Sequence, residues 1–144
     1  MVAIRVIINL ESWEKQLRGM REAGRVLKRG GTFLMSEATL QGWERLNAFR
    51  REWGLSDIPT PPFNRYLDQD EVASALAPEL ELAEVVDFSS TYYVGTRFLK
   101  PLLIQALGVD IDVADPEMHW NRFFSRLPPA GDYGVQRLFV LRKP

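Results

Sequence analysis

The chain has 144 residues, a net charge of -1 at pH 7, no cysteine and a single histidine. Disulfides, thiol catalysis and zinc fingers are therefore excluded, and a histidine-based metal site is nearly excluded too, so we expect no metal site. The basic residues are spread along the chain, which gives no electrostatic reason to expect nucleic-acid binding. No apolar run approaches the length of a membrane span. We therefore expect one soluble, cytoplasmic domain over residues 1–144.

The N-terminal quarter predicts a strand followed by a helix. Residues Ala3 to Leu10 are apolar and largely β-branched, which indicates a buried strand or the end of one. Asn9 and Ser12 are both candidate caps for the helix that follows. That helix is predicted from about Trp13 to Leu27, because its apolar residues recur every three or four positions and form one buried stripe.

A basic helix end and two glycines then lead into a second strand. Lys28 and Arg29 suit the negative end of the helix dipole, and Gly30 suits a left-handed exit from the helix. The residues from Thr32 to Ser36 are predicted as a short strand that ends at the carboxylate of Glu37. A helix, a tight turn and a strand in this order are typical of the crossover between two parallel strands.

The middle of the chain predicts two helices and a third strand. A helix is expected from about Leu40 to Trp53, and the proline-rich segment from Asp57 to Phe63 is expected to be an extended loop. Asp68 opens a capping box for a short helix that ends near Ala77. The residues from Leu82 to Tyr93 are predicted as a long strand.

The C-terminal third predicts two helices and a last strand. A short apolar helix is expected from Phe98 to Leu107, and Asp115-Pro116-Glu117 has the pattern of a second helix start. The last strand is predicted from Val135 to Arg142. The first three strands are joined by helical crossovers and should be parallel, whereas the last could be antiparallel. This order predicts an open α/β sheet of at most four strands, flanked by helices.

These segments resemble the second half of the class I S-adenosylmethionine-dependent methyltransferases. The resemblance is carried by the run from Ile4 to Leu10, the helix with Trp13 and Gln16, and the runs 25–31, 33–37 and 131–134. It implies a partial Rossmann-like sheet with the equivalents of strands four to seven of that family. The antiparallel strand seven, Val135 to Arg142, would then lie between strand five at Thr32 and strand six at Leu82.

The sequence departs from this family in one large respect, because its cofactor-binding half is absent. No Gly-x-Gly loop follows a first strand, and no acidic residue ends a second strand to bind the ribose hydroxyls. The resemblance therefore implies S-adenosylmethionine as cofactor only if the missing half is supplied. A truncated gene, a split enzyme with a separate N-terminal-half chain, and a remnant used for binding all remain possible explanations.

The resemblance also implies which residues near the first strand meet the ligands. Ala3, Ile4 and Arg5 would contact the methionine end of the cofactor, with Ile8 nearby, and Asn9 would contact the acceptor. Each polar residue has a simpler interpretation. Arg5 could be a solvated charge, and Asn9 could be a helix cap.

Four further residues are candidate acceptor-binding residues. Glu37 and Thr39 stand at the carboxyl end of a parallel strand, where open α/β sheets bind ligands, although Glu37 could instead interact with the start of the next helix. Tyr92, at the predicted end of the third strand, and Arg97 could line the same crevice. No catalytic residue is assigned, because methyl transfer depends mainly on the alignment of acceptor and methyl group.

Two functions are therefore expected from the sequence. The first is a methyltransferase portion that holds a small-molecule acceptor. The alternative is a catalytically inactive methyltransferase-like module that binds a partner protein or forms oligomers. Because the strand from Ala3 to Leu10 would be an apolar sheet edge, we expect a homo-oligomer or a second chain, but neither a nucleic acid nor a membrane, as partner.

Overall fold

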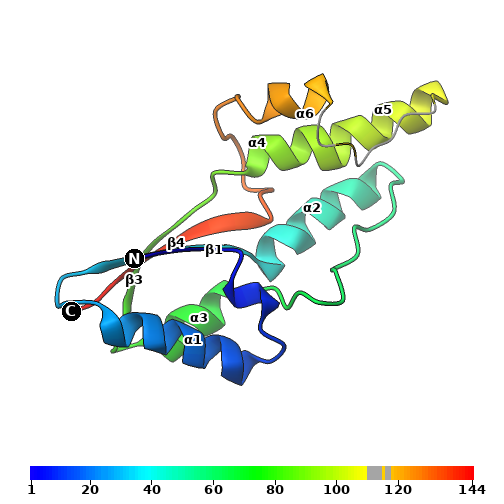
Figure 1. The fold of residues 1–144 in the computed structure, drawn as a ribbon. Helices are drawn as coiled ribbons and strands as arrows, with labels where there is room; N and C mark the ends of the chain where they lie inside the picture. The colour runs from blue at the N-terminus through cyan, green and yellow to red at the C-terminus, as the bar shows by residue number, and fades with distance from the viewer. Residues whose placement is uncertain (110–114, 116–117) are drawn as a thin grey trace.

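The computed structural model describes residues 1–109, 115 and 118–144 and shows an α/β fold with a four-stranded mixed sheet (Figure 1). The strands are β1 (Val2–Ile4), β2 (Thr32–Ala38), β3 (Glu81–Val86) and β4 (Gln136–Arg142). The helical segments are η1 (Ile7–Asn9), α1 (Trp13–Val26), α2 (Leu40–Glu52), α3 (Gln69–Leu76), α4 (Ser90–Tyr93), η2 (Val94–Leu99), α5 (Lys100–Leu107) and α6 (His119–Phe124).

The strand order across the sheet is β1-β2-β4-β3. β1 is parallel to β2, whereas β4 is antiparallel to both of its neighbours, so that β3 has the same direction as β2. The predicted directions are thus confirmed. The last strand of the chain lies between the second and third strands, with Met35 opposite Phe139.

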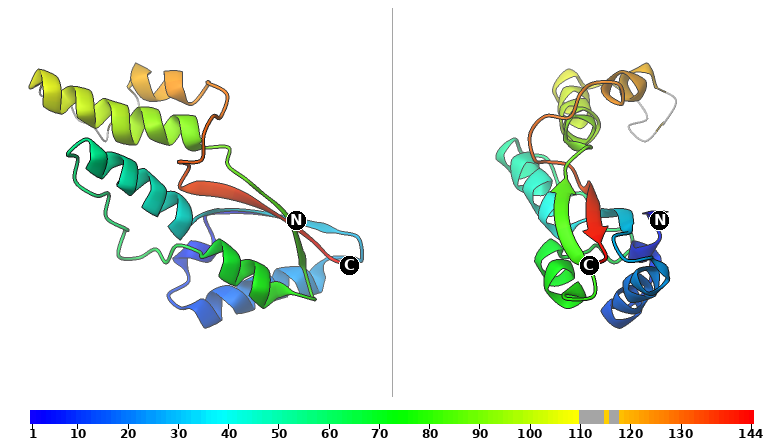
Figure 2. Two further views of the ribbon diagram at one scale, coloured as in Figure 1. Left: turned by 180° about the vertical axis from the view of Figure 1, so that it is seen from behind. Right: turned by 90° about the vertical axis from the view of Figure 1, so that its left-hand side faces the viewer.

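One face of the sheet is covered by α1 and α3, which lie side by side in both views of Figure 2. The core here contains Phe33 and Met35 of β2 and Phe139 and Leu141 of β4, all fully buried or nearly so. α1 begins at Ser12, whose hydroxyl accepts the backbone N–H of Lys15 at 3.3 Å. The predicted cap at Ser12 is therefore confirmed, and the capping interpretation of Asn9 is wrong.

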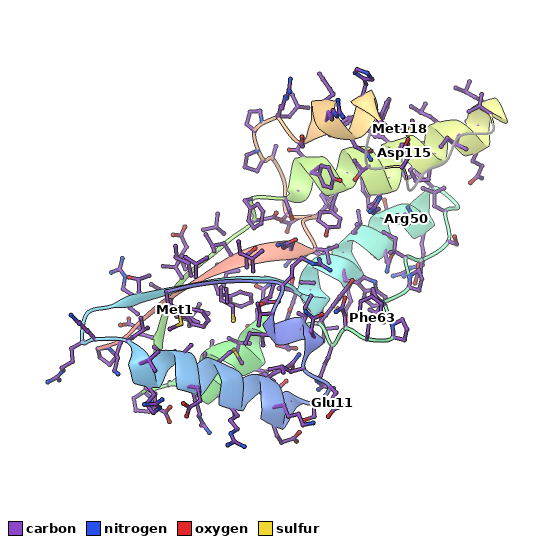
Figure 3. All side chains as sticks on the ribbon, viewed as in Figure 1. Met1, Glu11, Arg50, Phe63, Asp115 and Met118 are labelled. Atoms are coloured by element: carbon purple, nitrogen blue, oxygen red, sulfur yellow. The ribbon has the colours of Figure 1, made fainter. Side chains whose placement is uncertain are left out.

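The second layer consists of α2 and the long helical run from α4 through η2 to α5, beyond the carboxyl end of β2 (Figure 1). Phe49 of α2 stacks on Phe98 of η2, with ring centroids 4.0 Å apart. The buried Arg50, which Figure 3 shows between the two helices, donates to the carbonyl of Ser56 at 2.9 Å and to the carbonyl of Arg97. α2, the following loop and η2 are thereby held together.

The first predicted strand is too long, and its actual end is set by a turn. β1 ends at Ile4, Arg5 has a left-handed backbone with φ of 54°, and η1 occupies Ile7 to Asn9. The second half of the predicted Ala3 to Leu10 strand is therefore helical. The carboxylate of Glu37 accepts the backbone N–H groups of this turn, which gives the apolar residues an alternative to strand pairing.

The predicted strand from Leu82 to Tyr93 is also too long, because β3 ends at Val86 and helical structure starts at Ser90. Asp87 accepts the backbone N–H of Ser89 at 3.1 Å, which turns the chain out of the sheet. Tyr92 and Tyr93 consequently lie on α4 rather than at a strand end. The predicted helix start at Phe98 is wrong for the same reason, since the helical run is already under way there.

The predicted helix start at Asp115-Pro116-Glu117 falls partly outside the described part of the chain, which leaves out Pro116 and Glu117. The described helix α6 begins at His119, with Met118 as its cap residue. Among the residues described, none of the helices combines the length and the apolar character that a membrane crossing needs.

Candidate functional site

The candidate site lies where the parallel strands β1 and β2 end. Open α/β sheets bind ligands outside the carboxyl ends of their strands. Arg5 directly follows β1, Glu37 and Ala38 end β2, and Thr39 follows. The backbone N–H of Arg5 donates to the carbonyl of Ser36 at 2.9 Å, so the two strand ends are joined at this point.

Glu37 is fully buried, and both of its carboxylate oxygens accept backbone hydrogen bonds. The donors are Val6 and Ile7, both at 2.9 Å to Oε1, and Ile8 at 3.3 Å to Oε2. Burial raises the pKa of Glu37 above its ordinary value, opposed by these three hydrogen bonds and by the charge of Arg5. The Glu37 carboxylate therefore stabilises the turn after β1, because it accepts the backbone N–H groups of Val6, Ile7 and Ile8. The alternative expectation, an interaction with the start of α2, is not what these hydrogen bonds show.

Thr39 is fully buried and caps α2. Its hydroxyl accepts the N–H of Gly42 at 3.3 Å and donates to the carbonyl of Val135 at 3.2 Å. Leu67 pairs with Thr39 as an isolated parallel bridge, which brings the segment before α3 to the end of β2.

Asn9 is exposed and holds two loops together. Its side-chain amide donates to the carbonyl of Arg5 at 2.6 Å, and its Oδ1 accepts from the side chain of Asn64 at 2.7 Å. Ala3 is half-buried opposite Met35, whereas Ile4 is 62% exposed at the free edge of the sheet. The three predicted cofactor residues Ala3, Ile4 and Arg5 therefore lie along one edge of the sheet.

Two tyrosines and a second arginine complete the site. Tyr66 is adjacent to the bridge residue Leu67, and Tyr93 and Arg97 come from the α4–η2 helix, with all three half-buried. Burial raises the pKa of both Tyr66 and Tyr93, and the charges of Arg5 and Arg97 act on both hydroxyls in the opposite direction. The charges of Arg5 and Arg97 thus act on the same two hydroxyls, and we call Arg5, Tyr66, Tyr93 and Arg97 the arginine–tyrosine cluster.

Only part of this cluster is predicted from the sequence. Arg5 and Arg97 are among the predicted residues, but Tyr66 is not, and Tyr93 takes the place expected for Tyr92. The Tyr92 ring lies against Tyr93 in an edge arrangement with centroids 6.0 Å apart. No local pattern marks Tyr66, because its position depends on the pairing of Leu67 with Thr39.

The cluster offers positive charge and hydroxyl donors. Glu37 is the carboxylate that acts on Arg5, and its oxygens are already engaged by backbone N–H groups. Within the part of the chain that the structure describes, no three histidine, cysteine or acidic side chains gather as metal ligands. The arrangement is therefore suited to binding and orienting a ligand through charge and hydrogen bonds.

Comparison with known proteins adds no relative: no protein-family model matches the sequence, and no curated protein matches it significantly. The functional argument consequently depends on the residues and on their geometry.

Proposed function

We propose that this chain is the acceptor-side portion of a class I S-adenosylmethionine-dependent methyltransferase that acts on a small molecule. The observation that carries the proposal is the strand order β1-β2-β4-β3, in which only β4 is antiparallel. The resemblance implies this order for strands four, five, seven and six of that family. A chain with the same elements could have paired its last strand at the sheet edge instead.

The position of the arginine–tyrosine cluster supports the same proposal. Arg5 and Tyr66 lie at the ends of the two parallel strands, and Tyr93 and Arg97 approach from the helix beyond them. This is the place where an open α/β sheet binds its ligands. The acceptor would lie against this cluster, and the cofactor would lie along the edge formed by Ala3, Ile4 and Arg5.

The residues present fit only one side of such a cofactor. Ala3 and Ile4 offer apolar contact at the edge, but the carboxylate of Glu37, on which the charge of Arg5 acts, accepts three backbone N–H groups and is not available for ribose hydroxyls. The glycine-rich half must therefore come from elsewhere. When bound, S-adenosylmethionine supplies a methyl group on a sulfonium that is its own leaving group.

The chemistry left to this chain is alignment. Holding the acceptor in one orientation turns a bimolecular encounter into a positioned reaction, which is a large part of what an enzyme adds to methyl transfer. Tyr66 and Tyr93 serve as hydrogen-bond donors at neutral pH, because a tyrosine hydroxyl ordinarily has a pKa of 10.0 and burial raises the pKa of both further.

Calorimetric titration of the purified chain with S-adenosylhomocysteine tests the proposal. We expect weak binding, because this chain supplies one wall of the site, and a loss of about tenfold or more in affinity for Ile4→Glu, which places a charge against the ligand. Val26→Glu is the matched control, since Val26 is 53% exposed on α1. A folded chain that shows no binding at millimolar ligand, or equal effects of the two variants, would contradict the cofactor assignment.

A second candidate function is a module that binds a partner protein or a second copy. It is favoured by the apolar side chains Met1, Val2, Ile4 and Val6, which are between 50% and 63% exposed around β1. This surface and the cofactor edge overlap. The calorimetric titration distinguishes the two functions, because a module that only binds proteins would not bind S-adenosylhomocysteine.

A further inference from the structure

The loop between α2 and α3 contains a proline-rich segment, residues 58–64, with the sequence Ile-Pro-Thr-Pro-Pro-Phe-Asn. Every residue from Ile58 to Pro62 either is a proline or directly precedes one. A proline ring fixes its own φ, and the residue before a proline is restricted to extended backbone. The run from Ile58 to Pro61 therefore favours a polyproline II helix, a left-handed helix with about three residues per turn.

The exposure of the segment follows this three-residue period. Ile58, Pro61 and Asn64 are half-buried, whereas the two residues between each pair of them are exposed. Ile58 also packs against the hydrophobic core. One ridge of the polyproline helix therefore faces the protein, while Pro59 and Pro62, which are one turn apart, share a ridge that faces the solvent.

Both ends of the segment are bonded within the protein. The carbonyl of Ile58 accepts the indole N–H of Trp43 at 2.7 Å and the side-chain amide of Asn47 at 3.3 Å. The backbone N–H of Ile58 donates to Oδ1 of Asn47 at 2.8 Å. At the other end, the N–H of Asn64 closes a turn by donating to the carbonyl of Pro61 at 3.0 Å. The segment is thus ordered before any partner binds, which lowers the entropy cost of binding.

The exposed part of the segment is apolar and uncharged. Phe63 is 72% exposed in the turn, on the loop that leads from α2 to α3 (Figure 3). None of the residues 58–64 is charged, so the segment itself offers no cation for a nucleic acid or an anionic lipid. Prolines have no backbone N–H and leave carbonyl acceptors. Such a surface fits aromatic side chains, which pack on proline rings and can donate an indole N–H or a hydroxyl to the carbonyls.

We propose that residues 58–63 are a docking segment for a partner protein whose binding groove is lined with aromatic side chains. Grooves of this kind bind polyproline II ligands in which two prolines are separated by two residues, as Pro59 and Pro62 are. The ligand is rigid before it binds, which favours association. This docking goes beyond the proposed methyltransferase function and needs no cofactor.

Nuclear magnetic resonance of the nitrogen-15-labelled chain tests the proposal, with a purified SH3 domain and a purified WW domain as probes, because both have aromatic-lined grooves. We expect the amide signals of Thr60, Phe63 and Asn64 to shift with at least one probe, with a dissociation constant of about 1 mM or tighter. Pro59→Ala and Pro62→Ala should each weaken this binding about fivefold or more, because the ring and the fixed backbone are lost.

Pro129→Ala is the matched control. Pro129 is exposed and follows another proline, but no proline lies three positions from it, so it cannot form a ridge like that of Pro59 and Pro62. Circular dichroism confirms that each variant is folded. No shifts with either probe at millimolar concentration, or an equal loss for Pro129→Ala, would overturn the proposal. Pro59→Ala should leave the titration with S-adenosylhomocysteine unchanged, so the docking segment and the methyltransferase function are tested separately.

Discussion

Glu37 illustrates how the environment of a residue decides its role. The sequence places a carboxylate at the end of a parallel strand, where a substrate contact or a general base is a reasonable expectation. The structure shows three backbone N–H groups on that carboxylate, at 2.9 to 3.3 Å. No sequence pattern predicts these contacts, because the donors are about thirty residues away and become available only when the chain turns after Ile4.

Replacing Glu37 should therefore reduce stability. Glu37→Leu keeps the volume but leaves the buried N–H groups of Ile7 and Ile8 without an acceptor, and each such group costs about 1–3 kcal/mol. We expect a loss of about 2 kcal/mol or more in the free energy of unfolding measured with urea. Glu84→Leu, at an exposed position of β3, is the control and should change it little. Equal stability of the Glu37 variant and the wild type would contradict this role.

The raised pKa of Glu37 also predicts a pH dependence. A carboxyl group whose pKa is higher in the folded state stabilises the fold fully below its unfolded value and loses that contribution as the pH rises through the folded value. The wild-type advantage over Glu37→Gln should therefore decrease as the pH rises above 4.5, the ordinary value. Urea unfolding of both proteins between pH 4 and 7 measures this difference, and an increasing advantage would contradict the direction of the shift.

At the scale of elements, local signals predict the starts of α1 and α3 well, but they predict the strand ends poorly and miss the helical segments η1 and α4. Ser12 caps α1, Asp68 caps α3 through the N–H groups of Asp70 and Glu71, and Gly30 has the expected left-handed φ of 72°. β1 and β3 are shorter than predicted because side-chain acceptors, Glu37 and Asp87, remove the following residues from the sheet. The apolar pattern does not distinguish these residues from strand residues.

The junction between α2 and β4 depends on a glycine. A Cβ at Gly42 would overlap the backbone carbonyl of Gly134, which cannot move aside as a side chain can. We expect Gly42→Ala to lower the free energy of unfolding by about 1–3 kcal/mol. Gly19→Ala is the matched control within α1, where the new methyl group would lie 3.2 Å from the flexible side chain of Leu10.

The control should show no net loss, because alanine favours a helix by about 1 kcal/mol over glycine. Thermal unfolding of both variants gives the comparison. If Gly42→Ala were as stable as Gly19→Ala, the close approach of α2 to the Gly134 loop would not determine the fold.

At the scale of the whole molecule, the sequence predicts the strand directions because crossover connections leave few alternatives. The arginine–tyrosine cluster could not be predicted in full. It is assembled by the pairing of Leu67 beside Thr39 and by the early helical start at Ser90, and both are tertiary events. Arg5 and Arg97 were predicted individually, but nothing local indicates that they share two tyrosines.

The exposed edge of the sheet predicts association. Val2 and Ile4 of β1 are 63% and 62% exposed, and alternation along a parallel ladder directs their backbone groups away from β2. We propose that a second copy or a chain with the glycine-rich half covers this edge. Sedimentation velocity should show species larger than the 16.5 kDa monomer, reduced by Val2→Lys but not by Val26→Lys. A clean monomer at high concentration would contradict self-association.

The central claim is that the cofactor edge and the acceptor cluster form one site at the carboxyl end of β1 and β2. Nuclear magnetic resonance of the nitrogen-15-labelled chain during titration with S-adenosylhomocysteine tests it most directly. The account predicts amide shifts at Ala3, Ile4, Arg5 and the ends of β2, with smaller shifts at Tyr66 and Arg97. A folded chain without shifts at millimolar ligand, or with shifts confined to another part of the molecule, would contradict it.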